Sequence, residues 1–452
     1  MKKKLTVQEY VVVASMLFGL FFGAGNLIFP VHMGQMAGSQ LVPATLGFLI
    51  TGVGLPLLSV AALGISKSEG LFDLSRKVSR PYAYFFTCLL YLTIGPFFAI
   101  PRCATTAFTV GIEQAVPHAA ERLQLWLLVF SAVFFAAALL FSLFPGKILT
   151  WVGKILNPFF LLFLGILIVV ALVKPSAAIS AVAPEGAYAS QALSTGFLEG
   201  YNTMDALAGL AFGIIVVQVI RELGVTDADA VASSTVKAGV FSSLLMALIY
   251  LAVTVVGAQS RGLFETSENG GIALAQIARH YLGSAGLVIL AATVTLACLK
   301  TSVGLITSCA ETFCGMFPKG PKYRAWAVLF TLISFALSNF GLSTIISYSV
   351  PVLMFLYPLA IALVLLALFG RFYQHDRAVY ISVIVCTLLA ALYDLICALP
   401  EGLYDALHAD AVQAFGLRVL PFAGAGLGWI CPLALGFVIG LAVHLMQKFR
   451  TK

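Results

Sequence analysis

Long apolar segments alternate with short charged segments along the whole of this chain. Most of the apolar segments reach the length of about twenty residues that an α-helix needs to cross the hydrocarbon core of a membrane. The pattern therefore predicts an all-α polytopic membrane protein with about twelve spans, of which the third and eighth are long enough that they must tilt or protrude. The spans are expected near residues 11–34, 41–64, 81–112, 124–143, 147–173, 194–219, 232–258, 283–315, 325–340, 344–369, 378–398 and 420–446.

The distribution of Lys and Arg supports this number of spans and predicts the orientation of the chain. Cytoplasmic loops of membrane proteins carry an excess of these residues. With the N-terminus in the cytoplasm, nineteen of the 26 Lys and Arg residues fall in cytoplasmic segments, five in external segments, and two, Arg102 and Lys300, inside spans. Removing one span would reverse the side of every later loop and spoil this asymmetry. We therefore expect both termini to be cytoplasmic.

Composition agrees with a membrane protein and argues against other classes. The 452 residues are 61% hydrophobic and only 10% charged, with a mean hydropathy of +1.02, whereas soluble domains are about 25% charged. The net charge of +7 follows from cytoplasmic loops that face anionic lipid and does not indicate nucleic acid. The eight cysteines show no C-x-x-C spacing. We expect one membrane domain over residues 1–452, with no cofactor.

The first span contains a sequence that should interrupt a helix. GAGN, residues 23–26, lies at its centre, and Pro30 follows. Glycine and asparagine weaken a helix, and irregular backbone at membrane depth is tolerated only where protein buries it or where it lines a polar cavity. The segment is therefore either a kink for close helix packing or part of a binding site.

The sixth span has the same character, with glycines and the polar residues Asn202 and Asp205 in its first part. The two interrupted spans open two successive blocks of five, over residues 11–173 and 194–369, and two further spans follow over 378–446. Because five is odd, the second block must be inverted relative to the first. Discontinuous helices at matching positions of inverted halves indicate the midplane substrate site of a secondary transporter.

Three stretches also carry a family resemblance. GLFFGAGNLIFP (19–30), EGYNTMDALAGLAFG (199–213) and LKTSVGL (299–305) resemble the bacterial branched-chain amino acid:cation symporters, the BrnQ or LIV-II type carriers of the amino acid–polyamine–cation superfamily. The resemblance covers essentially the whole chain. It implies the LeuT-type fold with its 5+5 inverted repeat, a place in the bacterial cytoplasmic (inner) membrane, and import of Leu, Ile and Val driven by a Na⁺ gradient. A proton-coupled carrier of the same or other neutral amino acids is the alternative.

Residues around the two interruptions are expected to bind the amino acid. Exposed amides at the N-terminus of a half-helix carry roughly half a positive charge and suit a carboxylate, and freed carbonyls suit an ammonium group or a cation. Nothing in the sequence offers a fixed partner for a charged substrate side chain. The expected substrate-binding residues are Gly23, Ala24, Gly25, Asn26, Tyr91, Asp205, Gly209, Phe212 and Ile306.

The resemblance implies a Na⁺ site as well. In LeuT-type carriers, an adjacent Thr-Ser pair in span eight, here Thr301 and Ser302, supplies two hydroxyls to the ion. Backbone carbonyls that align with Gly19, Phe22 and Cys298 complete that site. The residues themselves leave an alternative open, in which the two hydroxyls have only a structural role. Hydroxyl groups in the middle of a span commonly donate to the backbone carbonyl one turn earlier.

Lys300 departs from the family motif and leaves the choice between Na⁺ and H⁺ open. It could take the place of the ion, titrate, or pair with a carboxylate, since the pKa of a lysine shifts readily on burial. We expect Arg102, Glu199 and Lys300 to act as gating or ion-pair residues. Glu311 and Asp394 lie nearer the ends of spans and are expected to be interfacial or paired.

Other functional classes fit the sequence less well. A membrane-embedded enzyme would need a nucleophile with its base or a set of metal ligands, and the chain has no H-E-x-x-H or G-x-S-x-G motif. Two interrupted helices suit a closed alternating site better than the permanent pore of a channel. We therefore predict a symporter whose partners are small neutral aliphatic amino acids, a monovalent cation and membrane lipid. The preference among Leu, Ile and Val stays open, since one methylene discriminates by only ~1–3 kcal/mol.

Overall fold

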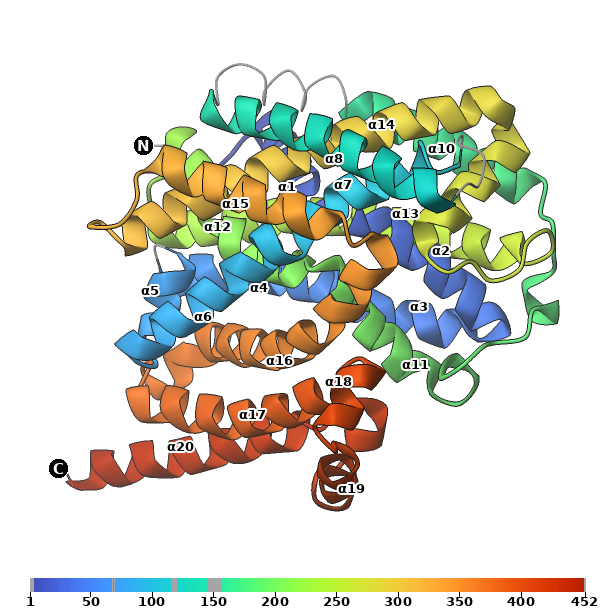
Figure 1. Cartoon of the computed structure of the whole chain (residues 1–452). Coiled ribbons are helices and arrows are strands. Elements are labelled where there is room, and N and C mark those ends of the chain that lie inside the picture. Colours follow the sequence, from blue (N-terminus) through green and yellow to red (C-terminus); the bar gives the residue numbers. More distant parts are fainter. Residues whose placement is uncertain (1–3, 67, 69, 115–119, 145–156, 451–452) are drawn as a thin grey trace.

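The computed structural model describes residues 4–450 except 67, 69, 115–119 and 145–156. Within these residues all regular structure is helical, and the helices run back and forth through one bundle. Both ends of the chain lie toward the same side of that bundle, at the left in Figure 1. An even number of spans requires this arrangement.

The helices of the described residues account for the twelve predicted spans. Eight stretches are long and apolar enough to cross a membrane, and three shorter helices are also apolar. One of the eight, Gly25–Ile65, has 41 residues and would be about 60 Å long, twice the hydrocarbon thickness. It turns at Gly38, where φ is +48°, and thus contains the second half of span one and all of span two.

The twelve spans follow one another along the chain, with four of them divided into two helices each. They are α1 (Val7–Phe21) with α2 (Gly25–Ala37), α3 (Leu41–Leu49) with α4 (Leu55–Ile65), α6 (Arg80–Leu92) with α7 (Ala99–Val110), α8 (Ala120–Leu143), α10 (Asn157–Val173), α11 (Tyr188–Glu199) with α12 (Asp205–Glu222), α13 (Ala228–Ser260), α14 (Gly270–Met316), α15 (Tyr323–Ser338), α16 (Leu342–Phe369), α17 (Arg377–Cys397) and α20 (Ile430–Arg450). The short helices between spans are α5 (Leu71–Arg76), α18 (Glu401–Ala406) and α19 (Asp410–Val419). The predicted start of span five, residues 147–156, lies outside the described residues.

The two spans that the sequence predicts to be long, the third and the eighth, are bent. Span three passes through a π-helical turn, Thr93–Phe97, in which Gly95 is non-helical and Pro96 cannot donate to the helix. Span eight begins earlier than predicted, at Gly270, and bends at Gly283, where φ is +66°. The expected boundary at residue 283 is thus a bend inside one helix, because a glycine can adopt this backbone conformation without unwinding its neighbours.

Each interrupted span packs against the second span of the other block. Helices α1 and α2 lie on α13, whereas α11 lies on α3 and α12 on α4. Glycines bring these backbones together: a methyl group at Gly34 of α2 would lie 2.1 Å from the carbonyl oxygen of Thr254, and one at Gly257 of α13 would lie 2.2 Å from that of Val31. Close approach through small residues is the usual basis of helix association in lipid.

The last two spans form a separate pair at the edge of the bundle. Helices α17 and α20 lie side by side, and α17 packs on α16 (Figure 1). Gly436 and Gly440 of α20 contact the backbone of α17 at Val383 and Val379. Most of the other α20 side chains are at least partly exposed and face the surroundings of the bundle.

The predicted orientation can be tested by cysteine labelling in a cysteine-free background. An impermeant thiol reagent added outside intact cells should label cysteines placed at Ser39 and Glu268, both exposed and next to predicted external loops around Gly38 and Ser267. It should spare cysteines at Asp229 and Lys319, which are equally exposed, until the cells are opened. Labelling of position 319 from outside would contradict the scheme.

Candidate functional site

The first span is interrupted at Phe22–Ala24, between α1 and α2. Phe22 has an extended backbone (φ −73°, ψ 97°) that ends α1. The Gly23 amide donates to Asn26 Oδ1 at 2.8 Å, so the Asn26 side chain satisfies one amide in the interruption. The first amides of α2 have no acceptor within the helix, as the sequence predicted for this segment.

The sixth span is interrupted at Gly200–Met204. A 3-10 turn, η6 (Gly200–Thr203), follows α11, and Met204 adopts a left-handed conformation (φ +62°) before α12 begins at Asp205. Such a conformation is uncommon for a residue other than glycine and costs of order 1–3 kcal/mol. Gly200 is required for packing, since a methyl group there would overlap the hydroxyl of Thr51.

The two interruptions meet in a buried polar cluster. Asn26 Nδ2 donates to Asp205 Oδ2 at 2.5 Å, and the Tyr250 hydroxyl of α13 donates to the same oxygen at 3.0 Å. Asn26 Nδ2 also contacts the Tyr250 hydroxyl. All three side chains are at most 2% exposed. The costly mid-span carboxylate is thus held by hydrogen bonds that also join the two broken helices.

Arg102 of α7 closes the opposite side of this region. Its Nη1 donates to the carbonyl oxygen of Asn202 at 2.7 Å, and its guanidinium lies 5.0 Å above the ring centre of Phe29. A methyl group at Gly25 would lie 2.9 Å from Arg102 Nη2. The glycine at the start of α2 therefore makes room for a cation beside the exposed amides.

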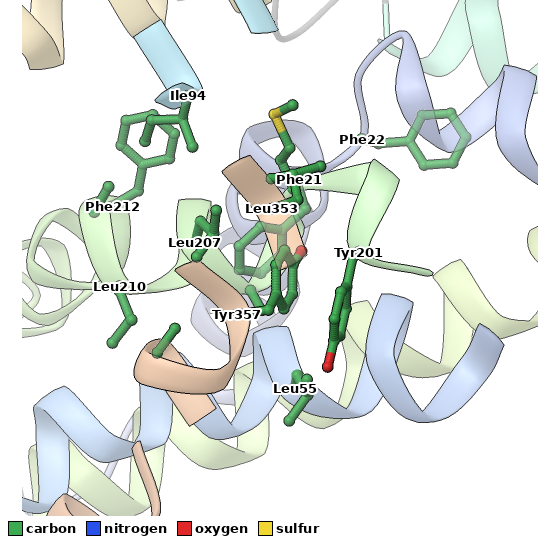
Figure 2. Packing of buried hydrophobic residues seen from close by; sticks show 14 of the residues in the cluster. Phe21, Phe22, Leu55, Ile94, Tyr201, Leu207, Leu210, Phe212, Leu353 and Tyr357 are labelled. Carbon is green, nitrogen blue, oxygen red and sulfur yellow. The ribbon is translucent and has the colours of Figure 1, made fainter. Parts of the chain in front are cut away.

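A cavity of about 250 Å³ opens at the interruptions and extends between α1, α12 and the second half of α14. Its apolar wall includes Ile94 and Phe212, whose side chains lie next to each other in Figure 2. Glu311, which is exposed, lines the cavity from the last two turns of α14. The cavity is lined by ten of the residues predicted from the sequence, Gly19, Gly23, Ala24, Gly25, Asn26, Arg102, Asp205, Phe212, Lys300 and Thr301.

Other predicted substrate residues pack around the cavity and do not line it. The Tyr91 hydroxyl donates to the carbonyl oxygen of Ala211 at 3.0 Å and so ties span three to α12. Gly209 faces α4, where a methyl group would lie 2.9 Å from Ser59 Cβ. Ile306 is fully buried in the hydrophobic core. In this structure these three residues have packing contacts, because α12 and α14 present only one face to the cavity.

The predicted cation ligands are divided between the cavity and its surroundings. Thr301 lies against the interruption of span one, with its hydroxyl 3.6 Å from the position of a methyl group at Gly23. It also donates to the carbonyl oxygen of Ala297 at 3.1 Å, which is the alternative that the sequence left open. Ser302 is fully buried, and its hydroxyl has no hydrogen-bond partner among the described residues. Hydroxyl oxygens are suitable ligands for a hard cation.

The remaining predicted residues lie behind the cavity wall. Phe22 is buried and stacks on Phe18, with ring centres 4.8 Å apart. Cys298 is buried on α14, beside Cys103. Glu199 accepts from Asn202 Nδ2 at 3.3 Å, and so it interacts within the interruption of span six.

Tyr250 is the site residue that the sequence reasoning missed. It lies in the apolar segment LIYLAV of span seven, where a single tyrosine is an ordinary core residue. Only its position opposite Asn26 and Asp205 gives it a distinct role. An inverted repeat requires span seven to pack on span one. This requirement is the one feature of the sequence from which a role for Tyr250 could have been inferred.

Comparison with known proteins agrees with this architecture. A family model described as branched-chain amino acid transport protein matches residues 6–447. The chain belongs to this family. It is 53% identical to the branched-chain amino acid permease BrnQ of Lactobacillus delbrueckii subsp. lactis over the full length of both chains. It is 39% identical to BrnQ of Bacillus subtilis, again over both full lengths, and 37% identical to BrnQ of Escherichia coli over 98% of this chain and 97% of that protein.

The fold of this family member is also found in a solved structure. Mhp1, a nucleobase-cation-symport-1 family transporter in a closed conformation with bromovinylhydantoin bound, matches with a TM-score of 0.56 and 16% identity, over 98% of this chain and 93% of Mhp1. This similarity shows the LeuT-like fold alone. The protein is thus a multi-pass membrane transporter and not an enzyme.

Proposed function

We propose that this protein is a secondary active symporter that imports leucine, isoleucine and valine, driven by a Na⁺ gradient, by alternating access around the cavity at the two interruptions. The observation that carries the proposal is the joint presence of Arg102, Asp205 and an apolar wall in one cavity between two broken helices. Its volume of about 250 Å³ lies below the ~300–1,000 Å³ of pockets for drug-sized ligands and suits an amino acid.

Each part of a branched-chain amino acid has a matching surface in this cavity. The carboxylate suits the free amides at the start of α2 and the guanidinium of Arg102, because both carry positive charge. The ammonium group suits Asp205 at the start of α12. The aliphatic side chain suits the wall of Ile94 and Phe212. In the predicted orientation the cavity faces the cytoplasm.

Na⁺ is favoured as the coupling ion by the position of two hydroxyls. Thr301 lies directly on the interruption of span one, and the buried Ser302 hydroxyl lacks a partner within the described chain. A cation held there would join α14 to α1. Proton coupling, with the same or other neutral amino acids as substrates, is the second candidate, because Lys300 and Asp205 line the same cavity.

The test is uptake of radiolabelled leucine by proteoliposomes that contain the purified protein. An inward Na⁺ gradient at equal pH should drive accumulation, whereas an inward proton gradient in Na⁺-free buffer should not. Equal accumulation with the proton gradient would replace Na⁺ by H⁺ in the proposal. Failure of leucine to exchange under any gradient would reject the substrate class.

Competition should reveal the selectivity of the cavity. Unlabelled isoleucine and valine should inhibit leucine uptake at concentrations similar to that of leucine itself, and lysine and glutamate should not inhibit it. The physical reason is that a charged side chain would lie against Ile94 and Phe212, away from water, and burying an unpaired charge is costly. The measurement is the half-inhibitory concentration of each competitor, and equal inhibition by glutamate and isoleucine would contradict the prediction.

Replacing Thr301 with alanine should lower the apparent affinity for Na⁺ and leave the maximal rate of uptake almost unchanged. The change removes one hydroxyl ligand and leaves the backbone in place, so the Na⁺ concentration for half-maximal uptake should rise about tenfold, with little loss at saturating Na⁺. Thr295→Ala is a matched control, because Thr295 likewise donates one turn back along α14, to Ala291, but does not line this cavity. An unchanged Na⁺ dependence in Thr301→Ala would remove this residue from the ion site.

A further inference from the structure

A buried carboxyl group lies outside the substrate cavity, on the next-to-last span. Asp394 of α17 is 6% exposed. The sequence predicts that it is interfacial or paired. It lies three residues before the end of α17, but among the described residues it forms no salt bridge, and its Oδ2 has no hydrogen-bond partner. It is covered because the chain enters α20 directly over it, with a methyl group at Gly428 3.5 Å from Asp394 Oδ1.

Two hydrogen-bond donors lie beside this carboxyl group. The Tyr201 hydroxyl of η6 and the Trp429 indole nitrogen are buried and, like Asp394 Oδ2, lack a hydrogen-bond partner among the described residues. Trp429 directly follows Gly428, which lies against Asp394 Oδ1, and the Tyr201 hydroxyl is close enough to both side chains for electrostatic interaction but forms no hydrogen bond with either. Buried polar groups in proteins are nearly always satisfied. Three unsatisfied groups that converge from α17, η6 and the start of α20 therefore mark a site.

This site is connected to the substrate cavity by two stacked tyrosines. The rings of Tyr201 and Tyr357 lie 4.0 Å apart and nearly parallel, at 13°, and their hydroxyls point in opposite directions (Figure 2). The Tyr357 hydroxyl lies near Thr203 and Ala206, at the cavity side of the interruption. Tyr201 itself belongs to η6, so any force on its hydroxyl acts on the interruption of span six.

We propose that Asp394 is a proton-binding site whose occupancy controls how firmly Tyr201 holds the interruption of span six. Neither donor bonds to the carboxyl group in this structure; in the proposal, an ionised Asp394 draws both Tyr201 and Trp429 into hydrogen bonds with it. When it takes up a proton from solution, it loses its charge and becomes a donor itself, so both bonds weaken. This step forms one O–H bond on Asp394 with a proton from solution, and it requires no other reactant.

The surrounding groups favour a proton over a metal ion as the ligand. Hard cations take several oxygen ligands, whereas the neighbours of Asp394 supply one phenol oxygen and one indole N–H. No group of three or more His, Cys, Asp or Glu residues suited to a metal is present in the described chain. Besides Tyr201, the titratable groups that interact with Asp394 are Tyr393 and Cys397 of α17. Tyr357 of the neighbouring α16 stacks on the ring of Tyr201.

The consequence is a pH-dependent affinity for the substrate, and this part rests on the function proposed above. Ionised Asp394 fixes η6 and with it the start of α12. Less of the backbone then has to become ordered when the substrate binds. Protonation loosens η6 and should weaken leucine binding. Couplings between sites typically change affinity by about 5–150-fold, and we expect about fivefold here.

The experiment is equilibrium binding of radiolabelled leucine to the purified full-length protein at saturating NaCl, from pH 5 to pH 9. The dissociation constant of the wild type should rise about fivefold toward low pH. Asp394→Asn, which resembles the protonated state, should show the weak binding at every pH. Trp429→Phe keeps the carboxyl group but removes a donor that stabilises its charge, so its transition should move upward by about one pH unit. Asp229→Asn, which changes an exposed carboxylate, should behave as the wild type.

The possible results separate the site from the transport function. A wild type that binds leucine with the same dissociation constant at every pH would overturn the proton site and leave the proposed function intact. A pH dependence that survives in Asp394→Asn would assign the titration to another group and also overturn it. A NaCl titration of leucine binding at pH 7 completes the test: a changed Na⁺ requirement in Asp394→Asn, with a pH profile like that of the wild type, would make the ligand a metal cation and overturn the proton site. If Asp394→Asn does not fold, the shift in Trp429→Phe decides, and no shift there would reject the proposal.

Discussion

Leucine uptake should fall about 30-fold or more when Asp205 is replaced by asparagine. In the proposed site this carboxylate is the partner of the substrate ammonium group, and removing one member of a buried charge pair costs about 2–5 kcal/mol, or roughly 30- to 4,000-fold. Asparagine has nearly the same size, and its oxygen can still accept from Tyr250, so the fold should survive. The measurement is the initial rate of radiolabelled leucine counterflow into proteoliposomes.

Tyr250→Phe is the matched control for this change. It removes one hydrogen bond to Asp205 Oδ2 but leaves the charge in place, so uptake should fall less than in Asp205→Asn, by about tenfold. Equal losses in the two variants would mean that Asp205 acts through its hydrogen bonds to the broken helices. Wild-type rates in Asp205→Asn would contradict a role in substrate binding.

A single methyl group at Gly257 should strongly destabilise the folded protein. In Gly257→Ala the new atom would lie 2.2 Å from the carbonyl oxygen of Val31, in the backbone of α2, which cannot move aside as a side chain can. Overpacking typically costs 1–3 kcal/mol, and contact with backbone belongs at or above the upper end of that range. Size-exclusion chromatography and the midpoint of thermal unfolding in detergent measure the loss.

Gly165→Ala provides the comparison, since a methyl group at Gly165 of α10 would meet no atom within 4 Å. Alanine is the better helix former by about 1 kcal/mol, so this variant should be as stable as the wild type or slightly more stable. Similar destabilisation of both variants would show that the close packing of α2 on α13 is not what makes Gly257 necessary.

The sequence predicts the fold well because each span carries its own signal. The interruptions at GAGN and at Gly200–Met204 follow from helix-weakening residues where an apolar helix should continue. The bends do not follow so simply. Gly283 and Gly95 have positive or otherwise non-helical backbone angles, whereas Gly34 and Gly257 are regular helical residues at close contacts. The sequence alone does not show whether a glycine permits a bend in the backbone or a close contact between two helices.

The site is less predictable, because the face of a helix that lines a cavity depends on tertiary packing. Asn26, predicted to bind the substrate, lines the cavity, and so do Arg102 and Thr301, for which the sequence predicts other roles, but Gly209 faces α4. Nothing in the sequence of span seven marks Tyr250 as a residue of the site. The burial of Asp394 depends on residues that immediately precede the start of α20, more than thirty positions away in the chain, and no local pattern could indicate it.

The reciprocal packing of the broken helices also determines the order in which the protein can assemble. Helices α1 and α2 pack on α13, and α3 and α4 pack on α11 and α12, all of which are synthesised later. The first three spans therefore enter the membrane with packing surfaces that only spans six to eight cover, and the surface of α7 stays open until α14 has been inserted. Neither block can complete its packing by itself. The binding cavity, which α14 helps to line, can form only after the eighth span is in place.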